Sequence, residues 1–431
     1  MSLLDQLPRL SAYDPGVAGE GGLDPLGLSA GADRIANVLA PGIRARMSLP
    51  RFVTVSAIGA IAYQTLHELT ADHGKTTVDI AFEWLVVEAI VRHPENGRTE
   101  GLPGNQKAAR AKAANVRLSR RTYLNGPRVF GFTGVYRPFS RDVRVLTSDD
   151  LPAENAARLV TAWERDFRLP GYVNGDSGTS GGKLRKHISD ACKRTLETGE
   201  CAPPPNGQLL RDLSNYLAPR EAKANERRVL RELITAGEHE IRNELTAKLI
   251  VSPPSEGTTQ RDLAQQLLQG ASKLTRRALQ AAIDYEEAAT ALDNTFRRFL
   301  AYTSQQHASV INPSDAMQTP GLAELAPRIG DLVQQAIASV DKLDDVGLSN
   351  ETVQGFRLFA SRLTPREFFD AIIERHEEVQ TNKKKLSWLD HLEGDWTVRI
   401  PYRKQSGDLK DDIWTHPMRL ATLAKFLAET A

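Results

Sequence analysis

Residues 258–306, TTQRDLAQQLLQGASKLTRRALQAAIDYEEAATALDNTFRRFLAYTSQQ, carry the pattern that decides the fold. Apolar side chains recur in this stretch at spacings of three and four residues, the period of a helix face that packs against other helices. An uninterrupted helix would be roughly 75 Å long, although Gly270 is a place where we expect a break. We therefore predict a coiled-coil seam or an inner bundle face. Its residues are Leu263, Leu267, Ala271, Leu274, Ala278, Ala282, Tyr285, Ala289, Leu292, Phe296 and Phe299.

Neighbouring segments extend this helical half. We predict one helix over Pro219–Val251 and another that begins at Ile329 and repeats the pattern. Thr364 is a residue type that caps a helix, and the proline and the acid that follow it at 365 and 367 favour a helix start. Only 6% of the residues are aromatic, which also favours helix over sheet. We assign 208–385 to a helical bundle or coiled coil.

The last residues, 386–431, show a different pattern. Trp396–Tyr402 alternates as a strand does, and the QSGD that follows could form its turn. His416–Glu429 should form a closing helix. We therefore predict a small C-terminal β-hairpin followed by a helix.

The N-terminal half begins with an irregular arm, 1–45, that is rich in Gly and Pro and holds one short helix near Ala32–Leu39. Two helices should follow, Pro50–Leu69 and Val78–His93. Further on, NGDSGTSGGK has the composition of a flexible linker, and the Pro-rich CAPPPNG is the expected main domain boundary.

A strongly basic segment lies between these features. From Arg98 to Arg144 the chain has eleven Lys or Arg and two acids, an excess of nine positive charges, although the 431-residue chain has a net charge of only +1. The order of elements predicted in and after this segment is a helix over Lys107–Arg121, a short helix, a β-prone run over Val143–Thr147 and a helix over Pro152–Arg168. This order is typical of a winged-helix-like domain, which we assign to 46–200, with Val143–Thr147 as its wing.

Clustered cations on a compact domain are typical of nucleic-acid binding, because Lys and Arg neutralise phosphates. Arg137 and Arg141 are four residues apart and share a helix face if Pro138 lies in the first turn of that helix. We assign no base-reading residue. The alternative is that the basic face packs against acidic groups of this chain or of a partner. The predicted nucleic-acid-binding residues are Arg117, Arg120, Arg121, Arg128, Arg137, Arg141 and Arg144.

Catalytic and metal-binding patterns are missing from the sequence. The tract before Lys183 lacks the spacing of a phosphate-binding loop, since Ser177 and Leu184 occupy its defining positions. No His-Glu pair continues as a zinc-protease helix does, and Cys192 and Cys201 are too few for a zinc site or a disulfide framework. We predict no catalytic residue, no metal and no cofactor, while a nuclease with an unrecognised site stays open as an alternative.

Neither the first residues of the sequence nor its apolar runs suggest a membrane. MSLLDQLPRLSAYD lacks the basic and apolar regions of a signal peptide. The longest apolar stretch, Phe52–Leu69, is interrupted by polar residues, whereas a spanning helix needs about 20 apolar ones. We expect a cytoplasmic protein that does not contact membranes.

Four stretches carry a resemblance to known sequences: LDPLGLSAGADRIANVLAPGIRAR, YLNGPRVFGFTGVYRPFSRDVRVL, TAWERDFRLPGY and WTHPMRLATLAKFL. They resemble uncharacterised proteins of bacterial phage-defence islands that have a winged-helix-like domain. The resemblance covers under a quarter of the chain and contains no catalytic signature. It implies a component that works beside helicases, nucleases or methyltransferases in anti-phage defence.

These observations favour a non-enzymatic scaffold that binds nucleic acid, with DNA as the expected form. Partner proteins would dock on the helical half. The long seam could close within one chain or between two, so a homo-oligomer is possible on this pattern. The main alternative is a protein-interaction adaptor that does not bind DNA.

Overall fold

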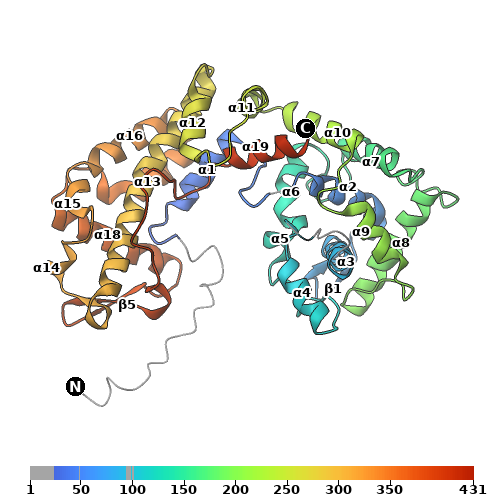
Figure 1. The fold of residues 1–431 in the computed structure, drawn as a ribbon, viewed down its shortest axis with the longest axis horizontal. Helices are drawn as coiled ribbons and strands as arrows, with labels where there is room; N and C mark the ends of the chain where they lie inside the picture. Colours follow the sequence, from blue (N-terminus) through green and yellow to red (C-terminus); the bar gives the residue numbers. More distant parts are fainter. Residues whose placement is uncertain (1–23, 48, 94–98, 100) are drawn as a thin grey trace, which may run out of the picture. The chain divides into compact units, whose positions relative to one another are not determined.

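Helices contain most of the residues that the computed structural model describes, which are 24–47, 49–93, 99 and 101–431 (Figure 1). The prediction of a mainly helical protein is confirmed for these residues. The chain groups into two units, and each unit combines segments that are distant in the sequence. Unit 1 comprises Met1–Leu39 and Gly257–Met418, and unit 2 comprises Ala40–Glu256 and Arg419–Ala431.

Unit 2 is organised around two buried helices, α2 (Arg51–Tyr63) and α3 (Val78–Arg92). Every residue of α2 is buried, and in α3 every residue except Arg92. A helix that is apolar on all faces is stable only inside a core. The two helices pack against α4 (Asn105–Ala113), α6 (Phe132–Asp142), α7 (Glu154–Phe167), α8 (Ser180–Thr198) and α9 (Gln208–Leu217).

The expected boundary at CAPPPNG lies inside unit 2, so that prediction is wrong. Residues 201–207 contain no helix, but the backbone N–H of Cys201 donates to the carbonyl oxygen of Leu118 at 2.7 Å. The helix after them, α9, packs against α3. Proline interrupts secondary structure without separating cores, and composition therefore indicated a boundary where none exists.

The Gly/Ser tract is also not a linker. Thr179 caps α8 by accepting a hydrogen bond from the N–H of Gly182 at 3.2 Å. A Cβ on Gly181 would overlap the carbonyl oxygen of Leu169, and one on Gly182 would overlap the backbone of Asp176. The glycines are therefore explained by close backbone packing.

The helix predicted over Pro219–Val251 forms as two helices, α10 (Ala224–Thr235) and α11 (Glu240–Val251). Both pack against α19 (Leu420–Glu429), which comes from the end of the chain. Unit 2 also holds a short hairpin of β1 (Thr70–Ala71) and β2 (Thr76–Thr77).

Unit 1 is built on α13 (Lys273–Gln305), the longest helix in Figure 1. The chain breaks before it at Gly270, which has a φ of +65°, and α12 (Gln260–Leu268) lies on the other side of the break. The seam residues are buried except Leu274, which is 45% exposed in the first turn of α13. Around α13 pack α1 (Ser29–Leu39), α12 and α16 (Ile329–Asp341). The buried residues of the seam therefore pack against helices of unit 1.

The remaining elements of unit 1 surround this core. The helix start at Thr364 is confirmed, because its hydroxyl and Glu367 form a reciprocal capping box. The last strand is β5 (Asp395–Val398), and its hairpin turns at Glu393 and Gly394 rather than at QSGD. The other elements are α14 (Pro313–Ala316), α15 (Leu322–Leu325), α17 (Val346–Phe356), α18 (Pro365–Asn382), β3 (Val310–Ile311) and β4 (Leu389–Leu392), with antiparallel sheet order β3-β5-β4.

The predicted N-terminal arm falls partly outside the described residues, since 1–23 are not among them. Its described part is ordered, and α1 packs against α13 and α17. No helix in the described ranges is both long enough and apolar enough to cross a membrane.

Candidate nucleic-acid interface

The basic segment folds over α3 as α4, an irregular stretch, α5 (Pro127–Phe130) and α6. The helix predicted over Lys107–Arg121 ends at Ala113. Asn115 has a φ of +53°, a left-handed conformation that stops a helix and that asparagine tolerates. Arg117 therefore lies in an irregular stretch, and Arg120 and Arg121 lie in turns, rather than on a helix face.

Three acids of α3 hold this segment in place. Asp79, Glu83 and Glu88 are all buried. A buried carboxylate needs hydrogen bonds or a cation, because removal from water costs several kcal/mol. Glu88 accepts from the guanidinium of Arg117 at 2.7 Å and from the N–H of Leu118 at 2.6 Å. The acids of the central helix are thus anchors for the basic segment.

Glu83 is the most enclosed of these anchors, and no cation pairs with it among the described residues. Its carboxylate accepts from the Tyr123 hydroxyl at 2.8 Å, from the N–H of Thr133 at 2.9 Å and from the Thr133 hydroxyl at 2.6 Å. A Cβ on Gly131 would overlap this carboxylate. Burial raises the pKa of Glu83 to about 7, although these hydrogen bonds oppose the increase.

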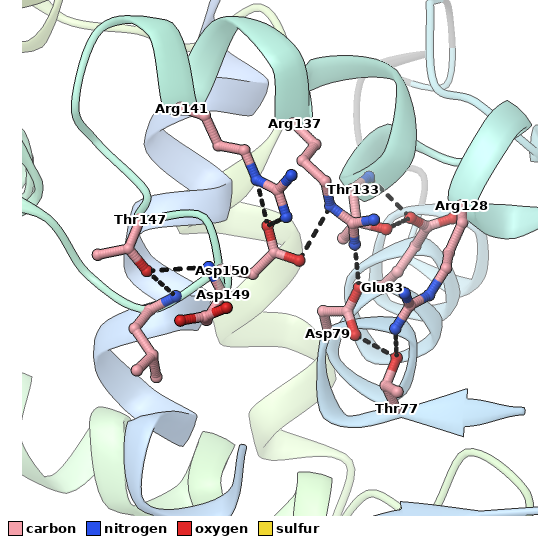
Figure 2. A network of polar contacts seen from close by, with 11 residues as sticks. Thr77, Asp79, Glu83, Arg128, Thr133, Arg137, Arg141, Thr147, Asp149 and Asp150 are labelled. Atoms are coloured by element: carbon pink, nitrogen blue, oxygen red, sulfur yellow. Dashed lines mark hydrogen bonds and ion pairs between the residues drawn. The ribbon is translucent and has the colours of Figure 1, made fainter. Parts of the chain in front are cut away.

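Arg137 and Arg141 lie on one face of α6, as predicted, but they point toward acids of this chain (Figure 2). Arg137 bridges Asp79 at 2.7 Å and Asp150 at 3.1 Å. Arg141 contacts the other oxygen of Asp150 at 2.9 Å. Pro138 is inside α6 rather than in its first turn. Arg137 and Arg141 therefore share a helix face, but both are paired with the acids Asp79 or Asp150 of unit 2.

The predicted wing does not form. Val143–Thr147 contains no strand, and only an isolated bridge joins Leu146 to Pro152. The stretch is a turn in which the Thr147 hydroxyl accepts from the N–H of Leu151 at 3.2 Å, and it places Asp150 under α6 (Figure 2). Apolar residues here fill the core beside α6 instead of pairing as strands. The winged-helix assignment is not confirmed.

Two other predicted residues, Arg144 and Arg128, also have partners within unit 2. Arg144 forms ion pairs with Glu154 and Glu238. Arg128 is exposed and donates to the hydroxyl of Thr77 at 3.0 Å. The Thr77 contact is neutral, so the charge of Arg128 is not compensated there.

Arg120 and Arg121 differ from the other five. Both are exposed, and neither has a hydrogen-bond or ion-pair partner within the part of the chain that the structure describes. They line an open hollow of about 370 Å³ with Asp72 and Asn125. Asp72 already accepts a hydrogen bond from the Thr76 hydroxyl at 2.6 Å. Of the seven predicted arginines, five thus have hydrogen-bond or ion-pair partners, and Arg120 and Arg121 have none within the described residues.

Sequence reasoning did not identify the residues that organise this region, namely Asp79, Glu83, Glu88 and Asp150. A signal for the first three existed in VDIAFEWLVVEAIVR, where acids interrupt a helix that is otherwise apolar all round. Such acids must be buried and must therefore have partners. Asp150 had no comparable signal.

Catalytic chemistry gains no support from the described residues. They contain no group of three or more His, Cys, Asp or Glu arranged to hold a metal. Burial raises the pKa values of the Cys192 and Cys201 thiols, which disfavours their reactive thiolate forms. Comparison of the chain with protein-family models, with curated proteins and with solved structures found no match.

Proposed function

We propose that this protein is a non-enzymatic component that binds the phosphate backbone of nucleic acid through Arg120 and Arg121, together with Arg128. The observation that supports this is the pair of adjacent, exposed guanidiniums without carboxylate partners. Arginine binds phosphate with two parallel hydrogen bonds. A guanidinium that has no protein partner can do so without breaking an ion pair or a hydrogen bond within the protein.

The binding should be modest and strongly dependent on salt. Each neutralised phosphate contributes roughly 0.7 to 0.9 to the slope of log affinity against log salt. Three contacts would give a slope of about −2 to −3. The number of phosphate contacts does not include Arg117, Arg137, Arg141 and Arg144, because these residues form ion pairs within the protein.

A protein-interaction adaptor is the second candidate. It is favoured by the same ion pairs, because most of the basic segment is used to stabilise unit 2 rather than to present charge. In either case the proposed setting is a multi-protein system such as anti-phage defence, with partner proteins on the helices of unit 1.

The test is a binding titration of the full chain on fluorescein-labelled DNA across a salt series. Arg120→Ala with Arg121→Ala should weaken binding at least tenfold and reduce the slope by about 1.5. The matched control is Lys183→Ala with Lys425→Ala, which removes two exposed charges elsewhere in unit 2. Binding by the arginine variant that equals the parent's would refute this site, and no binding by the parent would favour the adaptor.

A further inference from the structure

The basic segment exposes apolar side chains as well as cations that have no partner within the described residues. In α5, Val129 is 61% exposed and Phe130 is 37% exposed. The guanidinium of Arg46 lies 4.5 Å from the centre of the Phe130 ring. An exposed aromatic ring held by an arginine is a surface on which a flat, electron-rich group can stack.

The β1–β2 hairpin connects this ring to the arginine hollow. Arg128, which precedes Val129 and Phe130, donates to Thr77 of β2. The neighbouring Thr76 donates to Asp72, which lines the hollow with Arg120 and Arg121. The segment that carries the exposed ring and the hollow that Arg120 and Arg121 line are therefore both joined to the β1–β2 hairpin, and we call this set of residues the strip.

Recognition of a duplex by a winged helix needs a helix that enters the major groove and a strand at the wing. Neither is available at the predicted positions. The cations of α6 are paired with Asp79 and Asp150, its apolar side is in the core, and Val143–Thr147 is a turn. Of the predicted arginines, Arg120 and Arg121 are exposed in turns without a partner within the described residues, and the Phe130 ring is exposed as well. Single-stranded nucleic acid is recognised by this combination, with stacked bases and phosphates held by cations.

We infer that the strip binds single-stranded nucleic acid, with a base stacked on Phe130 and phosphates of the same strand held by Arg120 and Arg121. This inference rests on the proposed function and names its substrate class. Stacking tolerates any base, so little sequence preference is expected.

The experiment compares three labelled probes of equal length on the full chain: oligothymidine, a mixed-sequence duplex, and an abasic strand that has phosphates but no bases. Oligothymidine should bind at least tenfold more tightly than either of the others. Phe130→Leu keeps the apolar volume and should weaken oligothymidine binding about tenfold. It should leave the salt slope and abasic-strand binding unchanged. Phe130→Trp enlarges the ring and should strengthen oligothymidine binding.

The outcomes distinguish failure of the single-strand inference from failure of the proposed phosphate binding. Equal binding of duplex and oligothymidine, with Phe130→Leu like the parent, would overturn the single-strand inference and leave phosphate binding intact. In that case, weaker binding of all three probes by the double variant Arg120→Ala with Arg121→Ala would support the phosphate contacts. Absence of binding to every probe at low salt would overturn both. Val129→Ser, which removes a neighbouring exposed apolar side chain without touching the ring, is the matched control.

Discussion

At the scale of single residues, Glu83 shows how a buried acid without a cation can be accommodated. Three donors surround it, and the Tyr123 hydroxyl also lies 3.2 Å from the carbonyl oxygen of Pro103. When Glu83 is ionised, Tyr123 donates to it. When Glu83 is protonated, it can donate to Tyr123, and Tyr123 can turn its own proton to Pro103. Both protonation states are therefore hydrogen-bonded, which matters because the pKa of Glu83 is raised to about 7.

The raised pKa of Glu83 predicts that unit 2 loses stability as the pH rises. The unfolded carboxyl titrates at about 4.5 and the folded one at about 7, so the folded state holds the extra proton between these values. Glu83→Gln imitates the protonated form. The free energy of unfolding of this variant, relative to the parent, should increase by about 2 to 3 kcal/mol from pH 5 to pH 8.

Urea titrations of both proteins at several pH values would measure this difference. Glu197→Gln, an exposed substitution on α8, is the control and should follow the parent. If Glu83→Gln and the parent have parallel pH profiles, Glu83 is not the titrating group. The sequence indicated the burial of Glu83 through its apolar neighbours, but not its partners Tyr123 and Thr133, which lie 40 and 50 residues away.

At the scale of elements, α6 and the turn after it show why basic side chains on one helix face need not be free to bind phosphate. Acids of the same unit pair with them. The spacing of Arg137 and Arg141 on one face could be predicted, since it depends only on helical period. What that face contacts depends on tertiary packing. Asp150 has a φ of +62° and lies in a turn that a β-prone sequence did not indicate.

Removal of the Asp150 charge tests this arrangement. Asp150→Asn keeps a residue that tolerates left-handed backbone, so the substitution isolates charge from strain. It should lower the free energy of unfolding of unit 2 by about 1 kcal/mol, because the two ion pairs are partly exposed. It should also steepen the salt slope of DNA binding as Arg141 becomes available, whereas Arg137 stays paired with Asp79.

Asp149→Asn, one residue earlier and exposed, is the matched control for both measurements. An unchanged unfolding midpoint in Asp150→Asn would show that these ion pairs add no stability. An unchanged salt slope would show that Arg141 stays unavailable to phosphate even without its carboxylate partner.

The elements that could be predicted were those with a local signal. The seam of α13, its break at Gly270 and the capping box at Thr364 depend on period, backbone freedom and hydrogen bonds between near neighbours. The elements that were mispredicted depend on distant partners. Residues 201–207 are held by Leu118, and the glycines before α8 are required by the backbone of Leu169 and Asp176.

At the scale of the whole molecule, the two units are interleaved along the chain, which passes between them after Leu39, Glu256 and Met418. Composition along the chain cannot show such an arrangement, because neither unit is one continuous segment. Unit 2 is completed only by α19, the last helix. Its core therefore depends on contacts between residues almost 300 positions apart.

Phe426 of α19 makes two such contacts with α6. Its ring stacks on Tyr136 at 6.2 Å between centroids and meets Phe139 edge-on at 5.9 Å. Phe426→Ala should therefore cost about 3 to 5 kcal/mol of unit 2 stability. Hydrogen exchange would show it as lost amide protection in α6, while protection in α13 of unit 1 is unchanged. Lys425→Ala, exposed on the same helix, should leave both unaffected. Equal loss of protection in α6 and α13 would mean that the units unfold together, and no loss in α6 would mean that α19 is not part of its core.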